Sequence, residues 1–229
     1  NAGTLALNGA GKTAGNLTIN PTGILTVTDN SVSPTNNRLG GSSKTLTLAG
    51  ATFNYTANAT STSSENTAGW TFNAGLSNVN ITPGAGSTIL GTGSLSWGGG
   101  STALITSAGL GASNTNTLKF SGTINNNFGQ GSNTVGATTK SVLSRMLVDN
   151  GTNPVNFGTY DAAGNGLRVL NATTEVNSTA LSLLTGGNNN VSTTTSQTVP
   201  VSSTVNSMDL KSGGGAVVGA NATFTIFSG

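Results

Sequence analysis

Short segments in which apolar residues alternate with threonine or asparagine recur along this chain, and glycine, asparagine or proline ends most of them. The clearest copies are Leu17-Thr18-Ile19-Asn20, Leu25-Thr26-Val27-Thr28, Leu46-Thr47-Leu48, Val79-Asn80-Ile81-Thr82 and Phe224-Thr225-Ile226. Alternation with a period of two indicates β-strands, but each copy buries only a few side chains and cannot hold a sheet alone. Stacking many similar units joins such fragments into one continuous core. The repetition therefore predicts a β-solenoid.

The composition of the 229 residues supports an ordered all-β chain with very little helix. Charged residues make up 6% of the chain, against roughly 25% in typical globular proteins, so uncharged polar side chains must keep it in solution. Low charge also describes disordered segments, but the local alternation of apolar and polar residues favours order. No stretch keeps the apolar spacing of an amphipathic helix. Residues 140–148 come nearest to it and have too few apolar positions.

The spacing of the strands predicts a parallel β-helix. Strands recur every ~7–12 residues, so a turn of three short strands would use about 20–27 residues, and the chain would form about nine or ten rungs. At ~4.8 Å between hydrogen-bonded strands, these rungs make a rod segment of roughly 45 Å. An antiparallel sandwich uses strands at the same intervals. The lack of Asn-Gly or Asp-Gly turns between long alternating strands argues against the sandwich.

Individual strands and turns follow from the same pattern. Strands are predicted at 3–7, 16–20, 24–28, 45–48, 52–55, 70–72, 79–82, 88–90, 95–97, 103–106 and 118–124, with an excursion loop at 58–68. In the turn at 20–23, Pro21 stands where φ near ~−65° is needed and Gly23 where a positive φ is expected.

In a parallel coil the Thr-x-Thr triplets have a simple meaning, because the central apolar residue points inward and both threonines point outward. Rows of threonine and asparagine stacked along the outside can hydrogen-bond to one another, which explains the low charge of the surface. A flat threonine array that binds ice would need triplets in register on nearly every rung. The three triplets are scattered along the chain at Thr26-Val27-Thr28, Thr45-Leu46-Thr47 and Thr223-Phe224-Thr225.

The absence of cysteine and histidine removes disulfides, thiol nucleophiles and the commonest metal ligands. The six carboxylates are too isolated for calcium, which takes several in one site, so we expect no metal and no cofactor. A net charge of +2 is too small to indicate nucleic acid. No apolar run reaches the length of about 18 residues that a membrane span needs. The first residue is Asn rather than Met, and we expect a segment of a longer protein.

Charged residues concentrate in the segment 140–175. It holds Lys140, Arg145, Asp149, Asp161, Arg168 and Glu175. The simplest interpretation is a loop or rung held by ion pairs. The alternative is a carbohydrate site with Tyr160, Asp161 and Arg168 as ligand contacts. A catalytic pair of acids would require Asp149, Asp161 and Glu175 to cluster on one face without pairing to arginine.

Two phrases of the sequence resemble a known family. The first is Arg145-Met146-Leu147-Val148 with Asn156-Phe157-Gly158-Thr159-Tyr160-Asp161-Ala162-Ala163-Gly164-Asn165-Gly166-Leu167-Arg168-Val169-Leu170, and the second is Asn206-Ser207-Met208-Asp209-Leu210-Lys211 with residues 212–229. Both are similar to phrases in large bacterial proteins that carry autotransporter-associated β-strand repeats, found in planctomycete-like and related bacteria. Gly158 replaces a residue that is more often alanine in that family. The resemblance implies a right-handed parallel β-helix that is exported and displayed outside the cell.

We therefore expect residues 1–229 to form a single β-solenoid segment of an exported, non-enzymatic structural protein at the bacterial cell surface or in the extracellular matrix. Exposed rung edges and low net charge lead us to expect self-association into fibres, end to end or laterally. The alternatives are an adhesin or carbohydrate-binding passenger segment that contacts surface glycans, and a less favoured polysaccharide-processing β-helix enzyme. Neither nucleic acid nor a cofactor is expected as a partner.

Overall fold

The computed structural model describes residues 3–29, 34–122, 132–161, 164–178, 181 and 189–227. Within these ranges the chain is all-β and contains no α-helix, as the sequence predicts. The chain divides into two compact units. Unit 1 comprises Asn1–Asn125, Arg145–Val155 and Asp161–Val169, and unit 2 comprises Asn126–Ser144, Asn156–Tyr160 and Leu170–Gly229.

Thirteen strands form one curled, mostly parallel sheet, and six more form three two-stranded parallel sheets. The strands of the large sheet are β1 (Thr4–Leu7), β2 (Leu17–Ile19), β3 (Ile24–Thr28), β4 (Gly41–Leu48), β5 (Thr52–Thr56), β6 (Ser63–Phe72), β7 (Gly75–Thr82), β8 (Thr88–Trp97), β9 (Ser101–Thr106), β10 (Asn116–Phe120), β11 (Leu143–Asp149), β12 (Asn156–Asp161) and β13 (Gly166–Val169). The strands of the small sheets are β14 (Asn190–Thr193), β15 (Ser196–Val199), β16 (Ser203–Val205), β17 (Ser207–Leu210), β18 (Gly215–Val218) and β19 (Phe224–Ile226).

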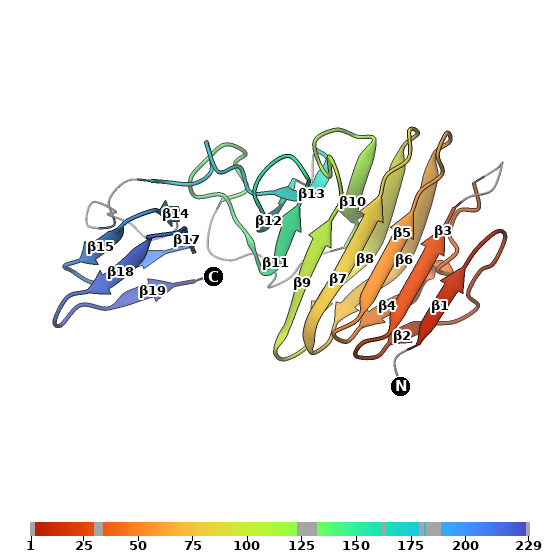
Figure 1. Ribbon diagram of the computed structural model, residues 1–229, viewed down its shortest axis with the longest axis horizontal. Helices are drawn as coiled ribbons and strands as arrows, with labels where there is room; N and C mark the ends of the chain where they lie inside the picture. The colour runs from red at the N-terminus through yellow and green to blue at the C-terminus, as the bar shows by residue number, and fades with distance from the viewer. Residues whose placement is uncertain are drawn as a thin grey trace. The chain divides into compact units, whose positions relative to one another are not determined.

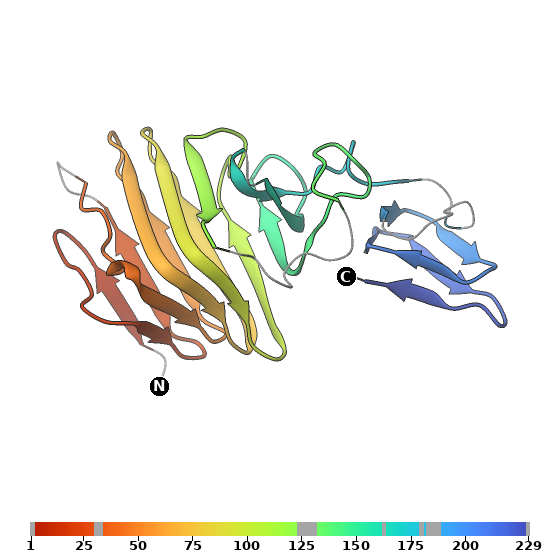
Figure 2. The same ribbon diagram turned by 180° about the vertical axis from the view of Figure 1, so that it is seen from behind.

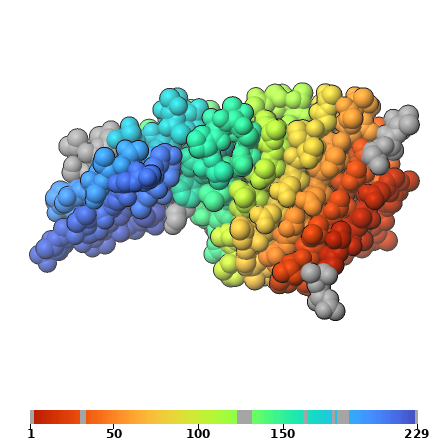
Figure 3. Space-filling model, in the orientation of Figure 1, coloured from red at the N-terminus to blue at the C-terminus, as the bar shows by residue number. Residues whose placement is uncertain are grey.

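Unit 1 is built from two stacks of parallel strands (Figures 1 and 2). β1, β3, β5, β7, β9 and β11 follow one another in one stack, and β2, β4, β6, β8, β10 and β13 in the other. From β1 to β10 the chain alternates between the stacks, so each turn of the coil lies on the turn before it. In the space-filling view of Figure 3, successive turns of unit 1 appear as successive bands of colour. The fold is therefore solenoid-like.

Each of these turns contributes two strands, whereas the sequence predicted three. Ile24 pairs with Thr52, 28 positions further on. Some predicted elements merge, because β8 covers two predicted strands and β6 begins inside the predicted loop 58–68. Glycine does not end these strands. Where it lies inside a strand, its missing side chain lets the backbone of the preceding turn come close. A Cβ at Gly93 would lie 2.3 Å from the carbonyl oxygen of Ala68.

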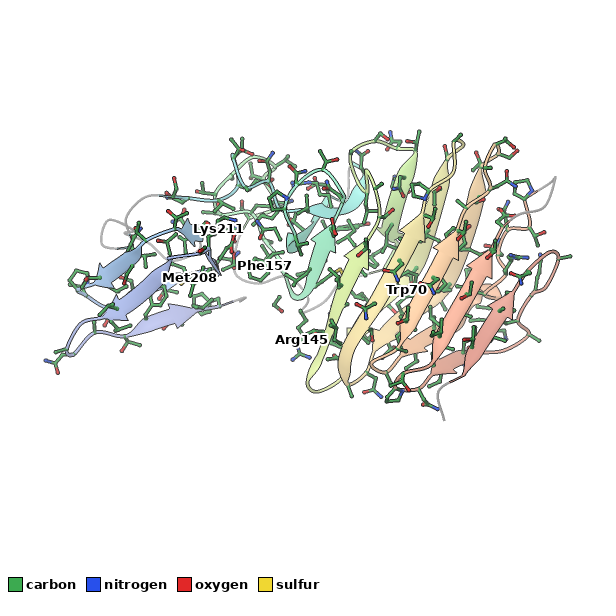
Figure 4. The ribbon with its side chains drawn as sticks, in the orientation of Figure 1. Trp70, Arg145, Phe157, Met208 and Lys211 are labelled. Carbon is green, nitrogen blue, oxygen red and sulfur yellow. The ribbon has the colours of Figure 1, made fainter. Side chains whose placement is uncertain are left out.

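Aromatic side chains join the two stacks inside unit 1. Phe53 on β5 meets Trp70 on β6 edge to face, with ring centroids 5.8 Å apart and planes at 83°. Trp70 also meets Phe72 edge to face, and Phe72 stacks on Trp97 at 4.9 Å. Trp70, labelled in Figure 4, is only 2% exposed. Such pairs each add about 0.5–1.5 kcal/mol beyond the burial of their area, so these rings help to hold both the stacks and successive turns together.

The short corners that lead from the second stack back to the first each contain a left-handed residue. The sequence predicted a positive φ at Gly23 in the first of these corners, but Thr22 has it instead. Gly23 is required for space, because a Cβ there would lie 2.9 Å from Cγ2 of Ile19. The left-handed residues of the four corners include Thr22 (φ 66°), Gly50 (φ 64°), Ala74 (φ 61°) and Gly100 (φ 68°).

Replacing Thr22 with glycine is expected to stabilise unit 1. A β-branched residue in the left-handed region is strained, and glycine removes this strain at some cost in unfolded-state entropy. The net gain should be up to about 1 kcal/mol, visible as a higher melting temperature in circular dichroism. Thr26→Gly, at a strand position with ordinary φ, is the matched control and should lower the melting temperature. A lower melting temperature for Thr22→Gly as well would contradict the prediction.

Unit 2 contains a coil with three strands per turn, the arrangement that the sequence predicted. β14, β15 and β16 form one turn, β17, β18 and β19 form the next, and each strand pairs in parallel with its counterpart. Asn190 pairs with Ser207, 17 positions further on, and Ser203 pairs with Phe224, 21 positions further on. The buried core of this coil consists of Leu181, Val191, Val199 and Val205.

The segment 140–148, which came nearest to a helix in the sequence, contributes to strand β11 instead. Leu143, Met146 and Val148 are buried there. In the part of the chain that the structure describes, no helix has both the length and the apolar character to cross a membrane.

Candidate functional site

The three predicted ligand contacts lie in different surroundings. Tyr160 belongs to unit 2, while Asp161 and Arg168 belong to unit 1. Tyr160 is 8% exposed, and its carbonyl oxygen accepts a hydrogen bond from Nζ of Lys140 at 3.1 Å. Asp161 and Arg168 form an ion pair, Nε to Oδ2, at 2.5 Å, with side chains 14% and 15% exposed. The pair offers little surface to a sugar, and ligand binding by these residues stays a prediction.

The other acids of the charged segment accept hydrogen bonds from backbone N–H groups. Oδ1 of Asp149 accepts a hydrogen bond from the N–H of Gly151 at 2.9 Å. Glu175 is fully buried in unit 2, and its two carboxylate oxygens accept the N–H groups of Gly136 and Asn171, each at 2.9 Å. Among the described residues, no three histidine, cysteine, aspartate or glutamate side chains are grouped so that they could hold a metal ion.

A buried polar network lies beside the first turn of the coil in unit 2. Lys140 is 1% exposed, and its Nζ donates to the carbonyls of Asn133 and Tyr160, both at 3.1 Å. Nδ2 of Asn206 donates to Oδ1 of Asn190 at 2.8 Å, and Nδ2 of Asn190 donates to the carbonyl of Lys140 at 2.7 Å. The two asparagines form a short ladder between successive turns, which helps to fix the register of β14 and β17.

A charged side chain is the largest of those fully buried in the described chain. Arg38 lies between β3 and β4 and is 0% exposed. Its Nη1 donates to the carbonyl of Leu7 at 3.0 Å and to that of Thr28, and its Nη2 donates to that of Gly9. Leu7 and Thr28 end β1 and β3, so one guanidinium ties the ends of two successive strands in the same stack. Nothing in the sequence reasoning singled out Arg38.

Two acids are buried in the same unit, and sequence reasoning did not single them out either. Asp29 and Glu65 are each 2% exposed. Oδ2 of Asp29 accepts a hydrogen bond from Oγ of Ser63 at 2.5 Å. Oε2 of Glu65 accepts the N–H of Leu39 at 3.1 Å, while its Oε1 has no hydrogen-bond partner. The alternation within β6, which puts residues 63, 65 and 67 inward, is the one local signal that could have identified Glu65.

Burial raises the pKa of Glu65 to about 6. The N–H groups of Arg38 and Leu39 and the charge of Arg38 favour the ionised form and oppose this rise, while the charge of Asp29 adds to it. Burial likewise raises the pKa of the Tyr55 hydroxyl above its usual range. Glu65 is therefore a buried acid whose charge changes under mildly acidic conditions.

The stability of unit 1 is expected to fall as the pH rises from about 4.5 to about 6. The ordinary pKa of the glutamate is 4.5 and that of folded Glu65 about 6, so between these values the folded state binds more protons than the unfolded state. Stability is highest below pH 4.5, and the loss, about 2 kcal/mol, is complete above pH 6. Glu65→Gln should remove this step and raise the melting temperature at neutral pH.

Melting curves measured across this pH range check the prediction. Asp209→Asn, which neutralises a partly exposed carboxylate in unit 2, is the control and should keep the step. A wild-type protein with flat stability over the range, or a Glu65→Gln variant with an unchanged step, would show that ionisation of Glu65 carries no such cost.

Uncharged polar side chains form rows in register on the outer surface of the first stack. Thr26, Asn54 and Asn80 occupy one row across β3, β5 and β7. Nδ2 of Asn80 donates to Oδ1 of Asn54 at 2.9 Å, which confirms the predicted hydrogen bonding along such a row at this place. The triplet that begins at Thr26 looks scattered in the sequence. In the fold its threonines have in-register counterparts on the next two turns, and Thr28, Thr56 and Thr82 form the second row.

Comparison with known proteins finds no match, whether with models of protein families, with curated proteins or with solved structures. The class of protein is defined by the fold alone, which is all-β and solenoid-like, with two strands per turn in unit 1 and three in the coil of unit 2.

Proposed function

We propose that the chain is a non-enzymatic structural β-solenoid segment of the bacterial cell surface or extracellular matrix. The proposal rests on the parallel, in-register stacking of turn upon turn in unit 1. Continuous ladders of backbone hydrogen bonds run along such a stack, and its core needs no cofactor, metal or disulfide to hold it. A stack of this kind supplies length and rigidity, which are the properties of a spacer or fibre.

The outer rows of threonine and asparagine support the same function. They solvate the coil with almost no charge, since charged residues make up only 6% of the chain. Copies with so little net charge repel one another weakly. We infer that they self-associate into fibres, either end to end or laterally.

The finer description follows the resemblance of the two phrases in the last part of the chain to proteins with autotransporter-associated β-strand repeats. It is a right-handed parallel β-helix of about nine or ten rungs, exported as a segment of a longer protein. A right-handed sense also agrees with the general preference of parallel strand crossovers.

Immunogold electron microscopy of intact cells tests the proposal. An antibody raised against the purified chain should label the outer surface, or extracellular fibres, of the bacteria that produce it. Cells from which the gene has been deleted provide the control for specificity. Label confined to the cytoplasm would contradict a structural role at the surface.

A further inference from the structure

The outer surface of the first stack is neutral over four successive strands. β3, β5, β7 and β9 contain no lysine, arginine, aspartate or glutamate, and they lie side by side in Figure 1. The next strand of this stack, β11, carries Arg145 and Asp149. In the second stack, β4 carries Lys44 and β10 carries Lys119. The charges of the coil are thus kept away from one part of its surface.

The outward side chains of these four strands lie in rows. We call them the neutral face. The Ile24 row is Ile24, Thr52, Asn78 and Leu104, the Thr26 row is Thr26, Asn54, Asn80 and Thr106, and the Thr28 row is Thr28, Thr56 and Thr82. The pairing across the four strands has no shift of register, whereas the pairing of β4 with β6 has one. The neutral face is therefore regular both along the strands and across them.

The side chains of the neutral face are short and held in place. Threonine has a branched Cβ, which restricts χ1. Nδ2 of Asn80 donates to Oδ1 of Asn54 at 2.9 Å, which orients both amides. Side-chain ladders of this kind stabilise flat sheets with little twist. Hydroxyl and amide groups are thus presented at fixed points, so little conformational entropy is lost when a partner binds.

We propose that the neutral face binds the surface of ice. Strands in a ladder lie ~4.8 Å apart, and outward residues along one strand lie ~6.6 Å apart. These two spacings are similar to the two repeats of the oxygen atoms on a prism face of ice. Ice also excludes ions from its lattice, and a surface without charge is complementary to it. Its water molecules donate and accept hydrogen bonds, as the hydroxyl and amide groups of the face do.

The Thr-x-Thr motif gains its counterparts only in the fold. Of the three triplets, Thr26-Val27-Thr28 lies on the neutral face. On the next two turns asparagine replaces the first threonine, in Asn54-Tyr55-Thr56 and Asn80-Ile81-Thr82. The same pair of outward polar groups therefore recurs in register on three successive turns. This is the regularity that an ice-binding array requires, and the scattered triplets of the sequence do not reveal it.

Ice fits the neutral face better than a sugar or a second copy does. Phe53 and Tyr55, the aromatic residues of β5, are buried on the inner side, so the face offers no aromatic ring to a sugar. Between two such faces packed dry, every buried hydroxyl and amide would need a partner among groups of the same kind. A layer of water can instead supply a donor or an acceptor to each group.

The purified chain should shape growing ice crystals and open a gap between the melting and freezing temperatures of ice. Asn80→Lys places a long, strongly hydrated ammonium group in the Thr26 row and should abolish both effects. Ser96→Lys is the matched control, because Ser96 is likewise exposed within a strand but lies on the outer surface of the second stack. It should leave both effects unchanged. Since both positions are exposed, the melting temperatures of the two variants should stay near that of the wild type.

A fluorescent label tests the match between the two lattices. The chain contains no cysteine, so Ser96→Cys introduces a single thiol, away from the neutral face, to which a dye can be attached. An ice crystal grown in a solution of the labelled chain should take up the dye on its prism faces. The same label on a chain that also carries Asn80→Lys should be excluded from the crystal.

Sedimentation of the wild type and of Asn80→Lys separates ice from a second copy as the occupant of the face. A wild type that forms dimers, loses them in Asn80→Lys and opens no freezing gap would overturn the proposal. Equal loss of the freezing gap in Asn80→Lys and Ser96→Lys, or exclusion of the labelled wild-type face from ice, would overturn it as well. The ice assays use the purified chain and the immunogold experiment uses intact cells, so failure of one leaves the other result standing.

Discussion

Replacing Arg38 with methionine is expected to lower the free energy of unfolding of unit 1 by about 3–5 kcal/mol. The buried guanidinium donates to the carbonyls of Leu7, Gly9 and Thr28, and methionine has no donor for any of them. A buried carbonyl left without a donor costs about 1–3 kcal/mol. The substitution also removes the positive charge that favours the ionised form of Glu65.

Arg145→Met is the matched control for this prediction. Arg145, labelled in Figure 4, is exposed and donates one hydrogen bond from Nη1 to the carbonyl of Gly98 at 2.8 Å. Its loss should cost no more than about 0.5 kcal/mol. Urea unfolding followed by circular dichroism measures both variants. Similar unfolding midpoints for the two would show that Arg38 does not hold the ends of β1 and β3 together.

The faces of the strands could be predicted from the sequence because alternation is a local property. Val27 is fully buried between the half-exposed Thr26 and Thr28, as the triplet predicts. The same rule places Phe53 and Tyr55 of β5, and Val79 and Ile81 of β7, inside. The all-β class and the near absence of helix follow from this period of two.

The number of strands per turn could not be predicted, because it depends on where the chain bends. Glycine has two different roles here, and the sequence does not distinguish them. Gly50 takes a left-handed conformation at a corner, whereas Gly23 and Gly93 leave room for neighbouring atoms. The glycines within β8 suggest a break between two strands, although the strand continues through them. Only the contacts between turns separate these roles.

The buried charges of unit 1 were missed for a related reason. Charge density along the sequence pointed to residues 140–175, which the fold divides between two units. Arg38 and Glu65 stand 27 positions apart, close to the 28 positions between Ile24 and its partner Thr52 on the next turn. The length of a turn therefore brings them into the same part of the coil. When the length of a turn is not known, Arg38 and Glu65 each look like an isolated charge in a sequence that has very few charges.

Replacing Gly84 with alanine is expected to destabilise unit 1 by about 3 kcal/mol. Gly84 lies in the corner between β7 and β8, which rests on the corner between β5 and β6 of the previous turn. A Cβ at Gly84 would lie 1.7 Å from the carbonyl oxygen of Asn58. The neighbour is backbone, so the two corners must move apart. Oδ1 of Asn58 also accepts the N–H groups of Thr60 and Ser61, each at 3.0 Å, so the corner that must move is itself hydrogen-bonded.

Gly99→Ala is the matched control for the steric cause. Neither Gly84 nor Gly99 has a positive φ, and a Cβ at Gly99 would have no atom within 4 Å. Alanine at position 99 should leave stability unchanged or raise it by about 0.4–1 kcal/mol, because it lowers the entropy of the unfolded chain. Opposite signs for the two substitutions, measured by thermal unfolding, are the expected result. Equal effects would show that these two successive corners are not in close contact. The turns would then not be tightly stacked at this place in the rod.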